Sequence, residues 1–265
     1  MRFFITGDIH GNIKRFSPQS MERKGYAPLT KDDVVLICGD FGIPWHYGIG
    51  DTCARWNGRI VLSGNAMQLK NLQDIGALFL FIDGNHEDFD LLEKYPVKTW
   101  NGGKVHELQP NLLHLMRGEV FNMEGIRFFT FGGAKSVDKQ YRIENESWWA
   151  REIPSEEEYR HALKNLEKVN NKVHFVFSHT APARFVVPFR KKLGFNPNDN
   201  HDRTMEMLTE IEKRISYQMW WFGHFHKNYA DKGRNVRWIY DSVDCIDITK
   251  KKDHAEIKGS ELNGL

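Results

Sequence analysis

Five short apolar runs in this sequence each end on polar side chains that can bind a metal ion, and this repetition constrains the fold more than any other feature. The runs cover residues 3–6, 34–38, 78–82, 173–178 and 219–222. Short runs rich in β-branched and aromatic residues and bounded by Gly or Asp are typical of buried strands. Since ligands collect at the carboxyl ends of strands in open α/β sheets, we expect one site formed by Asp8, His10, Asp40, Asn85, His86, His179, His224 and His226.

The first part of the chain predicts a parallel sheet. A helix interrupted by Pro18 is expected at residues 12–24, and a short helix is expected to end before Pro96. Between them, the insertion at residues 41–74 contains a predicted strand at 59–62 and a predicted helix at 67–74, and it could shape the mouth of a pocket. Strands joined repeatedly by such crossovers are typical of a parallel α/β core.

The second part of the chain predicts a change of sheet. Residues 120–122 and 126–131 flank Glu124-Gly125 as a hairpin, so the sheet becomes mixed or a second sheet begins. Ser155 and Glu158 form a capping box that starts a helix. A further helix is expected at residues 202–215, followed by strands over 219–249. We expect a single domain over residues 1–250 and a polar tail over 251–265.

Composition excludes several classes of protein. The three cysteines, Cys38, Cys53 and Cys245, form no CxxC pattern, which favours reduced thiols and a cytoplasmic location. No apolar stretch reaches the roughly 18 residues of a membrane span, and the first residues do not form a secretory signal. We therefore expect no membrane association. The formal charge of +2 offers no electrostatic argument for nucleic-acid binding.

The ligand types favour a centre that activates water. Two Asp, one Asn and several His provide oxygen and imidazole donors, whereas thiolates are absent from the set, which disfavours structural zinc. A two-metal site needs a carboxylate that bridges ions about 3.5–4 Å apart. Asp40, an isolated carboxylate at a predicted strand end, is the natural bridge.

The order of these motifs resembles that of the calcineurin-like metallophosphoesterase superfamily, in the form of its small bacterial members. The resemblance covers residues 6–226 and is carried by Asp8-x-His10, Gly39-Asp40, Gly84-Asn85-His86-Glu87, His179 and Gly223-His224-x-His226. It implies an α/β fold, a four-layer α/β/β/α sandwich with two facing mixed β-sheets.

The resemblance also implies roles for the residues. A first divalent ion would be held by Asp8, His10, Asp40 and His226, and a second by Asp40, Asn85, His179 and His224. The ions would be Mn, Fe, Zn or Ni, and a hydroxide bridging them would attack the phosphorus of a phosphomonoester or phosphodiester. His86 would be catalytic rather than a ligand, and Glu87 or Asp88 could orient it.

Other subclasses and a non-enzymatic role remain alternatives. Phosphoprotein phosphatases usually carry GDxVDRG where this chain reads Gly39-Asp40-Phe41-Gly42-Ile43-Pro44, so an arginine that would help to bind phosphate there is missing. Nuclease activity, and with it nucleic-acid binding, lacks support in the sequence. A binding scaffold that has lost its chemistry is disfavoured because every ligand of the motifs is present. The expected substrate is a small phosphate ester or a nucleotide.

Three further groups of residues have open roles. The segment 132–149 combines Lys135, Arg142 and the pair Trp148-Trp149, which would suit a phosphate ester with a flat leaving group; a turn with solvated charges is the favoured alternative. Residues 181–200 are expected to form a loop, and its cations are expected to be solvated, with a local basic patch as the alternative: Arg184, Arg190, Lys191 and Lys192. His46 and His201 lie in loops that could border the site.

Overall fold

A computed structural model describes residues 1–45, 54–56, 59–61, 64–192 and 201–248, and it contains two large mixed sheets. The first sheet has seven strands, and its four central strands β1, β2, β5 and β8 run parallel. Across the sheet, the strands follow one another in the order β15 (Asp244–Asp247), β1 (Arg2–Thr6), β2 (Val34–Cys38), β5 (Leu78–Ile82), β8 (Leu112–Leu115), β7 (Gly103–Gln109) and β6 (Val97–Trp100).

The second sheet has six strands, of which β10, β11, β12 and β14 run parallel. Their order is β13 (Tyr229–Asp231), β14 (Val236–Trp238), β12 (Met219–Phe222), β11 (Phe175–Ser178), β10 (Ile126–Phe131) and β9 (Val120–Met123). A separate antiparallel pair joins β3 (Ala54–Trp56) to β4 (Arg59–Val61).

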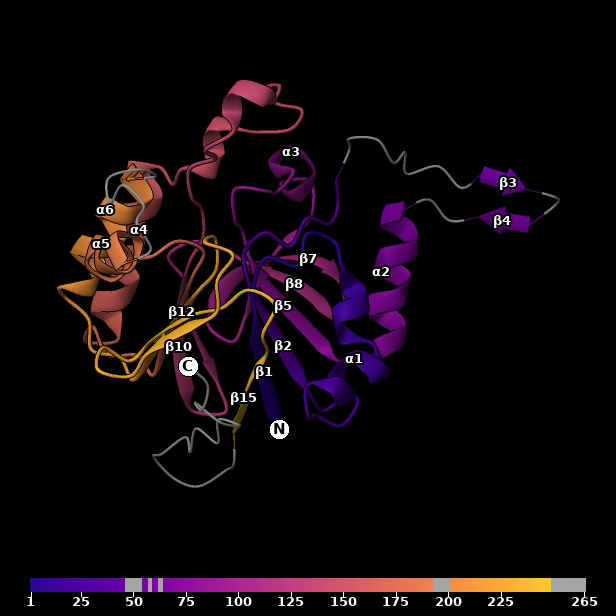
Figure 1. The fold of residues 1–265 in the computed structure, drawn as a ribbon, viewed down its shortest axis with the longest axis horizontal. Coiled ribbons are helices and arrows are strands. Elements are labelled where there is room, and N and C mark those ends of the chain that lie inside the picture. The colour runs from indigo at the N-terminus through magenta and orange to yellow at the C-terminus, as the bar shows by residue number, and fades with distance from the viewer. Residues whose placement is uncertain (46–53, 57–58, 62–63, 193–200, 249–265) are drawn as a thin grey trace.

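Helices cover the outer face of each sheet (Figure 1). The first sheet is covered by η1 (Ile13–Phe16), α1 (Pro18–Arg23) and α2 (Gly64–Ile75). The second is covered by α4 (Glu156–Lys168), α5 (Ala183–Lys192) and α6 (Arg203–Glu212). Three short elements lie in the connections: α3 (Phe89–Leu92), η2 (Lys139–Tyr141) and η3 (Ala150–Glu152).

The alternation of side chains along the strands confirms the predicted four-layer α/β/β/α sandwich. In β1, Phe3 and Ile5 belong to the central core between the sheets, whereas Phe4 belongs to the core beneath η1, α1 and α2. In β12, Trp221 faces the central core and Trp220 faces α5 and α6. Successive side chains of a strand point to opposite faces, so each buried strand contributes to two cores. The sequence of such a strand is therefore apolar at nearly every position.

Local signals in the sequence predicted most elements, with one clear error. The five strands lie at the expected places, and Ser155 caps α4 with the reciprocal Glu158 bond of a capping box. The expected loop at residues 181–200 is wrong over its first half, because Ala183–Lys192 form α5 despite Pro188. The apolar residues Phe185 and Val186 of α5 pack on the second sheet, and this burial outweighs the helix-breaking tendency of proline.

The domain boundary and the tail remain predictions. Strand β15 returns the chain to the first sheet, where it pairs with β1. Residues 251–265, the predicted tail, lie outside the described residues. Within the described part of the chain, no helix combines the length and apolarity needed to span a membrane.

Candidate metal centre

The turns after the strands bring the predicted ligands together by an uncommon backbone conformation. Five of these residues have positive φ angles, namely Asp8 (48°), His10 (45°), Asp40 (50°), His224 (68°) and His226 (48°). A non-glycine residue in this left-handed region costs roughly 1–2 kcal/mol. Such strain persists where the surrounding structure compensates for it, and it clusters at functional sites. These turns therefore lower the stability of the fold, and they point the five side chains toward one place.

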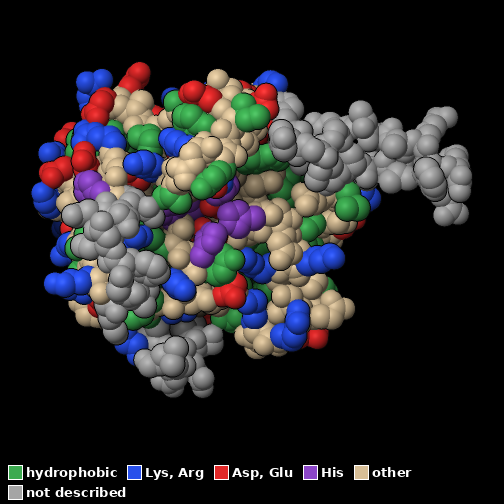
Figure 2. Space-filling view, turned by 45° about the horizontal axis from the view of Figure 1, so that its top comes forward, with side chains coloured by type: hydrophobic (Ala, Val, Ile, Leu, Met, Phe, Trp, Pro, Cys, Tyr) green, Lys and Arg blue, Asp and Glu red, His purple; other side chains and the backbone are tan. Residues whose placement is uncertain are grey.

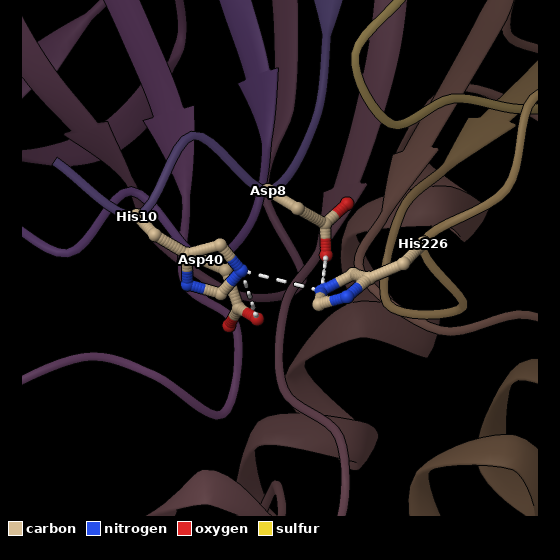
Figure 3. A group of neighbouring side chains, drawn as sticks. All are labelled: Asp8, His10, Asp40 and His226. Atoms are coloured by element: carbon tan, nitrogen blue, oxygen red, sulfur yellow. Dashed lines mark hydrogen bonds and ion pairs between the residues drawn. The ribbon is translucent and has the colours of Figure 1, made fainter. Parts of the chain in front are cut away.

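One set of ligands, here called the outer half, lies at the open side of the site. It consists of Asp8, His10 and His226 together with Asp40, and the four donor atoms lie within 4.8 Å of one another (Figure 3). The Nε2 atoms of His10 and His226 are 3.2 Å apart. His226 Nε2 lies 3.5 Å from Asp8 Oδ1, and His10 Nε2 lies 3.8 Å from Asp40 Oδ2. This spacing suits donors that point at a shared cation.

The other set, here called the inner half, is less exposed, since Asn85 and His179 are buried and His224 is half-buried. It consists of Asn85, His179 and His224, again together with Asp40. Asn85 Oδ1 lies 3.1 Å from His179 Nε2 and 3.0 Å from His224 Nδ1. Asp40 Oδ1 lies 3.2 Å from His179 Nε2. The two oxygens of Asp40 thus face different halves of the site.

Hydrogen bonds from the backbone hold these side chains in place. The carbonyl of Cys38 lies 2.8 Å from His179 Nδ1, so Nδ1–H donates to it and Nε2 is the nitrogen that would bind a metal. The N–H of His224 donates to Asp8, and the N–H of His86 donates to Asp40 Oδ1 at 2.8 Å. A Cβ on Gly84 would collide with Asp40 Oδ1, so only glycine permits this close approach.

Burial and neighbouring charges shift the pKa values of the ligands in the metal-free site. It lowers the pKa of His10 to about 4 and that of His224 to about 3, so both imidazoles are neutral at pH 7 and can donate a lone pair. Burial raises the pKa of Asp8 to about 8, because a carboxylate is poorly solvated there. Burial also opposes the charge on Asp40, but the neighbouring His179 lowers the pKa of Asp40 overall. Burial likewise opposes the charge on His179, but Asp40 raises the pKa of His179 to about 10. A divalent ion would take the place of the protons that Asp8 and His179 carry at pH 7, and the donor types fit one or more such ions.

The catalytic candidate His86 lies beside the ligands and contacts Arg142. The ring of His86 meets that of His10 edge to face at 5.2 Å, and Arg142 Nη2 lies 2.9 Å from His86 Nε2. Burial lowers the pKa of His86, and Arg142 lowers it further. Of the two residues expected to orient it, Glu87 accepts backbone N–H groups from Phe41, Gly42 and Gly84, and Asp88 accepts the N–H of Leu91.

Arg15 belongs to none of the sequence motifs, and it holds the turn at Asp8 in place. Its Nη1 donates to Thr6 Oγ1 at 3.0 Å and to the carbonyl of Tyr240 at 2.6 Å. Its Nη2 donates to the carbonyl of Asp8 at 3.3 Å. The ring of Tyr240 in turn stacks on His226 at 4.6 Å. Because the partners are up to 225 positions away in the chain, no local pattern could have indicated this role.

A cavity of about 410 Å³ opens directly on the ligands. Histidine side chains gather near the centre of the face on which it opens (Figure 2). The cavity combines ligands and His86 with apolar and cationic side chains, and its lining consists of Asp40, Asn85, His86, Val137, Asp138, Phe189, Arg190, His224, Phe225, His226 and Lys227.

The remaining candidates divide between the site and the rest of the surface. Arg190 lines the cavity, whereas Arg184 pairs with Glu212. His201 lies 3.4 Å from Glu206 and does not line the cavity. Trp149 is buried against Phe89 and Trp45, as expected for a residue that closes the core. His46 and the side chain of Lys192 lie outside the described residues.

Comparison with known proteins identifies the family. The family model for calcineurin-like phosphoesterases matches residues 1–228, and the chain belongs to this family. This result confirms the superfamily indicated by the motifs and the predicted class of enzyme, a metal-dependent phosphoesterase.

Relatives with curated names are distant. The chain is 22% identical to lariat debranching enzyme A of Xenopus laevis, over 97% of this chain and 49% of the relative. It is 23% identical to the lariat debranching enzyme of Drosophila melanogaster, over 87% of this chain and 43% of the relative. The chain thus spans about half the length of these relatives or less. Among solved structures, phosphopantetheinyl hydrolase from Mycobacterium tuberculosis matches 90% of this chain and 87% of its own, with a TM-score of 0.43 and 15% identity.

Proposed function

We propose that the centre binds two divalent cations and hydrolyses a phosphate ester. The observation that carries this proposal is the position of Asp40, whose Oδ2 lies 3.8 Å from His10 of the outer half and whose Oδ1 lies 3.2 Å from His179 of the inner half. A carboxylate so placed can bridge two ions. When bound, two such ions would polarise the phosphoryl group and activate the attacking water near neutral pH.

His86 is the proposed catalytic residue of the protein itself. It lines the cavity beside both halves and belongs to neither set of converging donors. From there its imidazole can stabilise charge on the phosphoryl oxygens or pass a proton to the leaving oxygen. Arg142, whose Nη2 faces the same ring, is placed to bind a phosphoryl oxygen and supplies a cation that the Gly39-Asp40 motif lacks.

The cavity favours a substrate with a flat apolar part and more than one negative charge. Phe189, Phe225 and Val137 offer apolar surface close to the ligands, and Arg190 and Lys227 add positive charge. A nucleotide has both properties. The second candidate is a nucleic-acid phosphodiester, which the names of the curated lariat debranching relatives favour.

A substrate panel assayed with several metals tests the proposal. Phosphomonoesters, cyclic nucleotides, dinucleotides, single-stranded DNA and a branched RNA would each be incubated with Mn²⁺, Fe²⁺, Zn²⁺ or Ni²⁺. We expect metal-dependent turnover, with nucleotide esters preferred over a small aliphatic phosphate. Binding of two ions without turnover of any ester would instead favour the non-catalytic scaffold.

We also propose that residues 1–250 form one domain of a cytoplasmic protein. The pairing of β15 with β1 supports the domain. The free, buried thiols of Cys38 and Cys245 support a reducing compartment, whereas Cys53 lies outside the described residues.

A further inference from the structure

A buried carboxylate outside the metal-binding motifs connects to the inner half of the centre. Glu152, at the end of η3, has no exposed surface. Its Oε1 accepts the N–H of Ser136 at 2.9 Å and pairs with the ammonium of Lys139 at 2.5 Å. Its Oε2 accepts the hydroxyl proton of Ser136 at 2.7 Å. A buried charge is costly unless it is fully paired, and here Lys139 and Ser136 supply the partners.

The direction of these hydrogen bonds determines which way the Asn85 side chain faces. A serine hydroxyl has one proton, and an ionised carboxylate can only accept. The Ser136 proton is therefore committed to Glu152, and Ser136 Oγ can only accept from its other neighbour. That neighbour is Asn85 Nδ2, at 3.1 Å. The amide NH₂ must point at Ser136, which leaves Oδ1 facing His179 and His224.

Without Ser136 and Glu152 the same pocket would accept Asn85 in either orientation. The oxygen and nitrogen of a carboxamide have nearly the same size, so packing alone cannot select between them. Only the oxygen can bind a cation; the NH₂ group would present two protons to it. A network that fixes the amide removes the unproductive orientation before any metal arrives.

The segment that carries the network is itself held against the site. The N–H of Gly133 donates to the carbonyl of Asp83 at 2.9 Å, and the N–H of Lys135 donates to Asp202 at 3.1 Å. The Lys139 ammonium, which neutralises Glu152, also lies 4.2 Å from the centre of the Trp148 ring. Ser136, with an exposed fraction of 2%, is thus fixed from both sides.

We propose that Ser136 and Glu152 are positioning residues that hold the Asn85 carboxamide with its oxygen toward the inner metal ion. The inference rests on the proposed function, since it concerns a ligand of the proposed centre. Neither residue touches the cavity or the proposed substrate. Their effect on catalysis passes through Asn85 and the affinity of one metal site.

The test measures Mn²⁺ binding to the metal-free protein by isothermal titration calorimetry. Ser136→Ala and Glu152→Gln are each expected to weaken one of two sites by about 10- to 100-fold, the usual effect of removing a residue that orients a ligand. The other site keeps its wild-type affinity. Ser155→Ala, a serine nearby in the chain that caps α4, is the matched control: it lowers the melting temperature and leaves both affinities unchanged.

A second test, made in the Asn85→Asp variant, distinguishes a loss of amide orientation from a general disruption of the metal site. In Asn85→Asp both side-chain atoms are oxygens, so there is no amide to orient. Adding Ser136→Ala in this background is expected to cost no further affinity, which a double-mutant cycle would report as strong coupling. An equal loss in both backgrounds would overturn the inference.

The outcome for the wild type keeps the two proposals apart. If the wild-type protein binds fewer than two Mn²⁺ ions, the proposed function fails. The positioning role alone fails under a different result. In that case the wild-type protein binds two ions, and the Ser136→Ala variant also binds two ions with wild-type affinity. The melting temperature of the Ser136→Ala variant then falls as that of Ser155→Ala does.

Discussion

The two halves of the centre use the same kinds of ligand in different surroundings. In the outer half, the side chains of His10 and His226 are 35% and 49% exposed, and the strained turns after β1 and β12 aim them. In the inner half, Asn85 and His179 are 4% and 0% exposed, and hydrogen bonds of fixed direction aim them. His224, the third ligand of this half, is half-buried and follows β12 in the same strained turn as His226. The comparison teaches that backbone conformation aims the exposed histidines, whereas the buried Asn85 and His179 depend on partners for their remaining polar atoms.

Replacing the residue that both halves share should have the largest effect. In Asp40→Asn one oxygen becomes an NH₂ group, so the side chain can no longer offer an oxygen to each half. We expect loss of metal and a fall in turnover greater than the roughly 10²–10⁴-fold typical of removing a general acid. Metal analysis measures the metal content, and steady-state kinetics measure the turnover. Asp74→Asn, an exposed partner of Lys70, is the control; two ions retained in Asp40→Asn would contradict the bridging role.

Removing His86 should separate chemistry from metal binding. In His86→Ala we expect kcat to fall by about 10²–10⁴-fold, while the metal content stays at two ions, because His86 belongs to neither half. His201→Ala, an exposed histidine paired with Glu206, should behave like the wild type. Unchanged turnover in His86→Ala would remove its catalytic assignment.

Arg142 tests whether the cation beside His86 binds the substrate. A hydrogen bond to a charged group contributes roughly 1.5–3 kcal/mol. Arg142→Ala should therefore bind the phosphoryl group more weakly and lower kcat/KM by about 10- to 100-fold. Arg151→Ala is matched, because Arg151 pairs with Asp90 and Glu93 and does not line the cavity. An equal loss in both variants would indicate a general effect of removing charge.

The two halves should also release their metals in order. Because its histidines are more exposed, we expect the outer half to lose its ion first when a chelator is added in steps. Anomalous scattering from crystals at intermediate chelator concentrations would give the occupancy of each position. Earlier loss from the inner half would reverse the comparison.

The smallest effect is expected far from either half. Ser155→Ala removes the N-cap of α4 and should cost about 1 kcal/mol of unfolding free energy. Chemical denaturation measures this loss, and kcat should remain that of the wild type. A change in kcat would mean that α4 is coupled to the centre.

The sequence predicted the parts of this molecule that repeat or are local. The strands and the ligands after them could be predicted because an apolar run followed by Gly-Asp or Gly-His recurs, and the cap at Ser155 is a pattern within four residues. Helix α5 was missed because Pro188 argues locally against a helix, whereas packing on the second sheet favours it.

Long-range contacts account for the rest. Arg15 reaches Tyr240, Arg142 reaches His86, and Ser136 reaches Asn85 across separate segments. Each of these side chains belongs to a type that is ordinarily solvated. The sequence indicated Arg142 only as one cation of the segment 132–149, with solvated charges as the favoured alternative, and it did not indicate Arg15 or Ser136 at all. Their roles follow only from the distances between atoms that the fold brings together.

The central claim is that Asp40 bridges two cations, and one measurement tests it most directly. Crystals of the wild-type protein soaked in Mn²⁺ would be used for an anomalous difference map. The account predicts two peaks about 3.5–4 Å apart, one on each side of the Asp40 carboxylate. A single peak, or two peaks of which only one contacts Asp40, would contradict it.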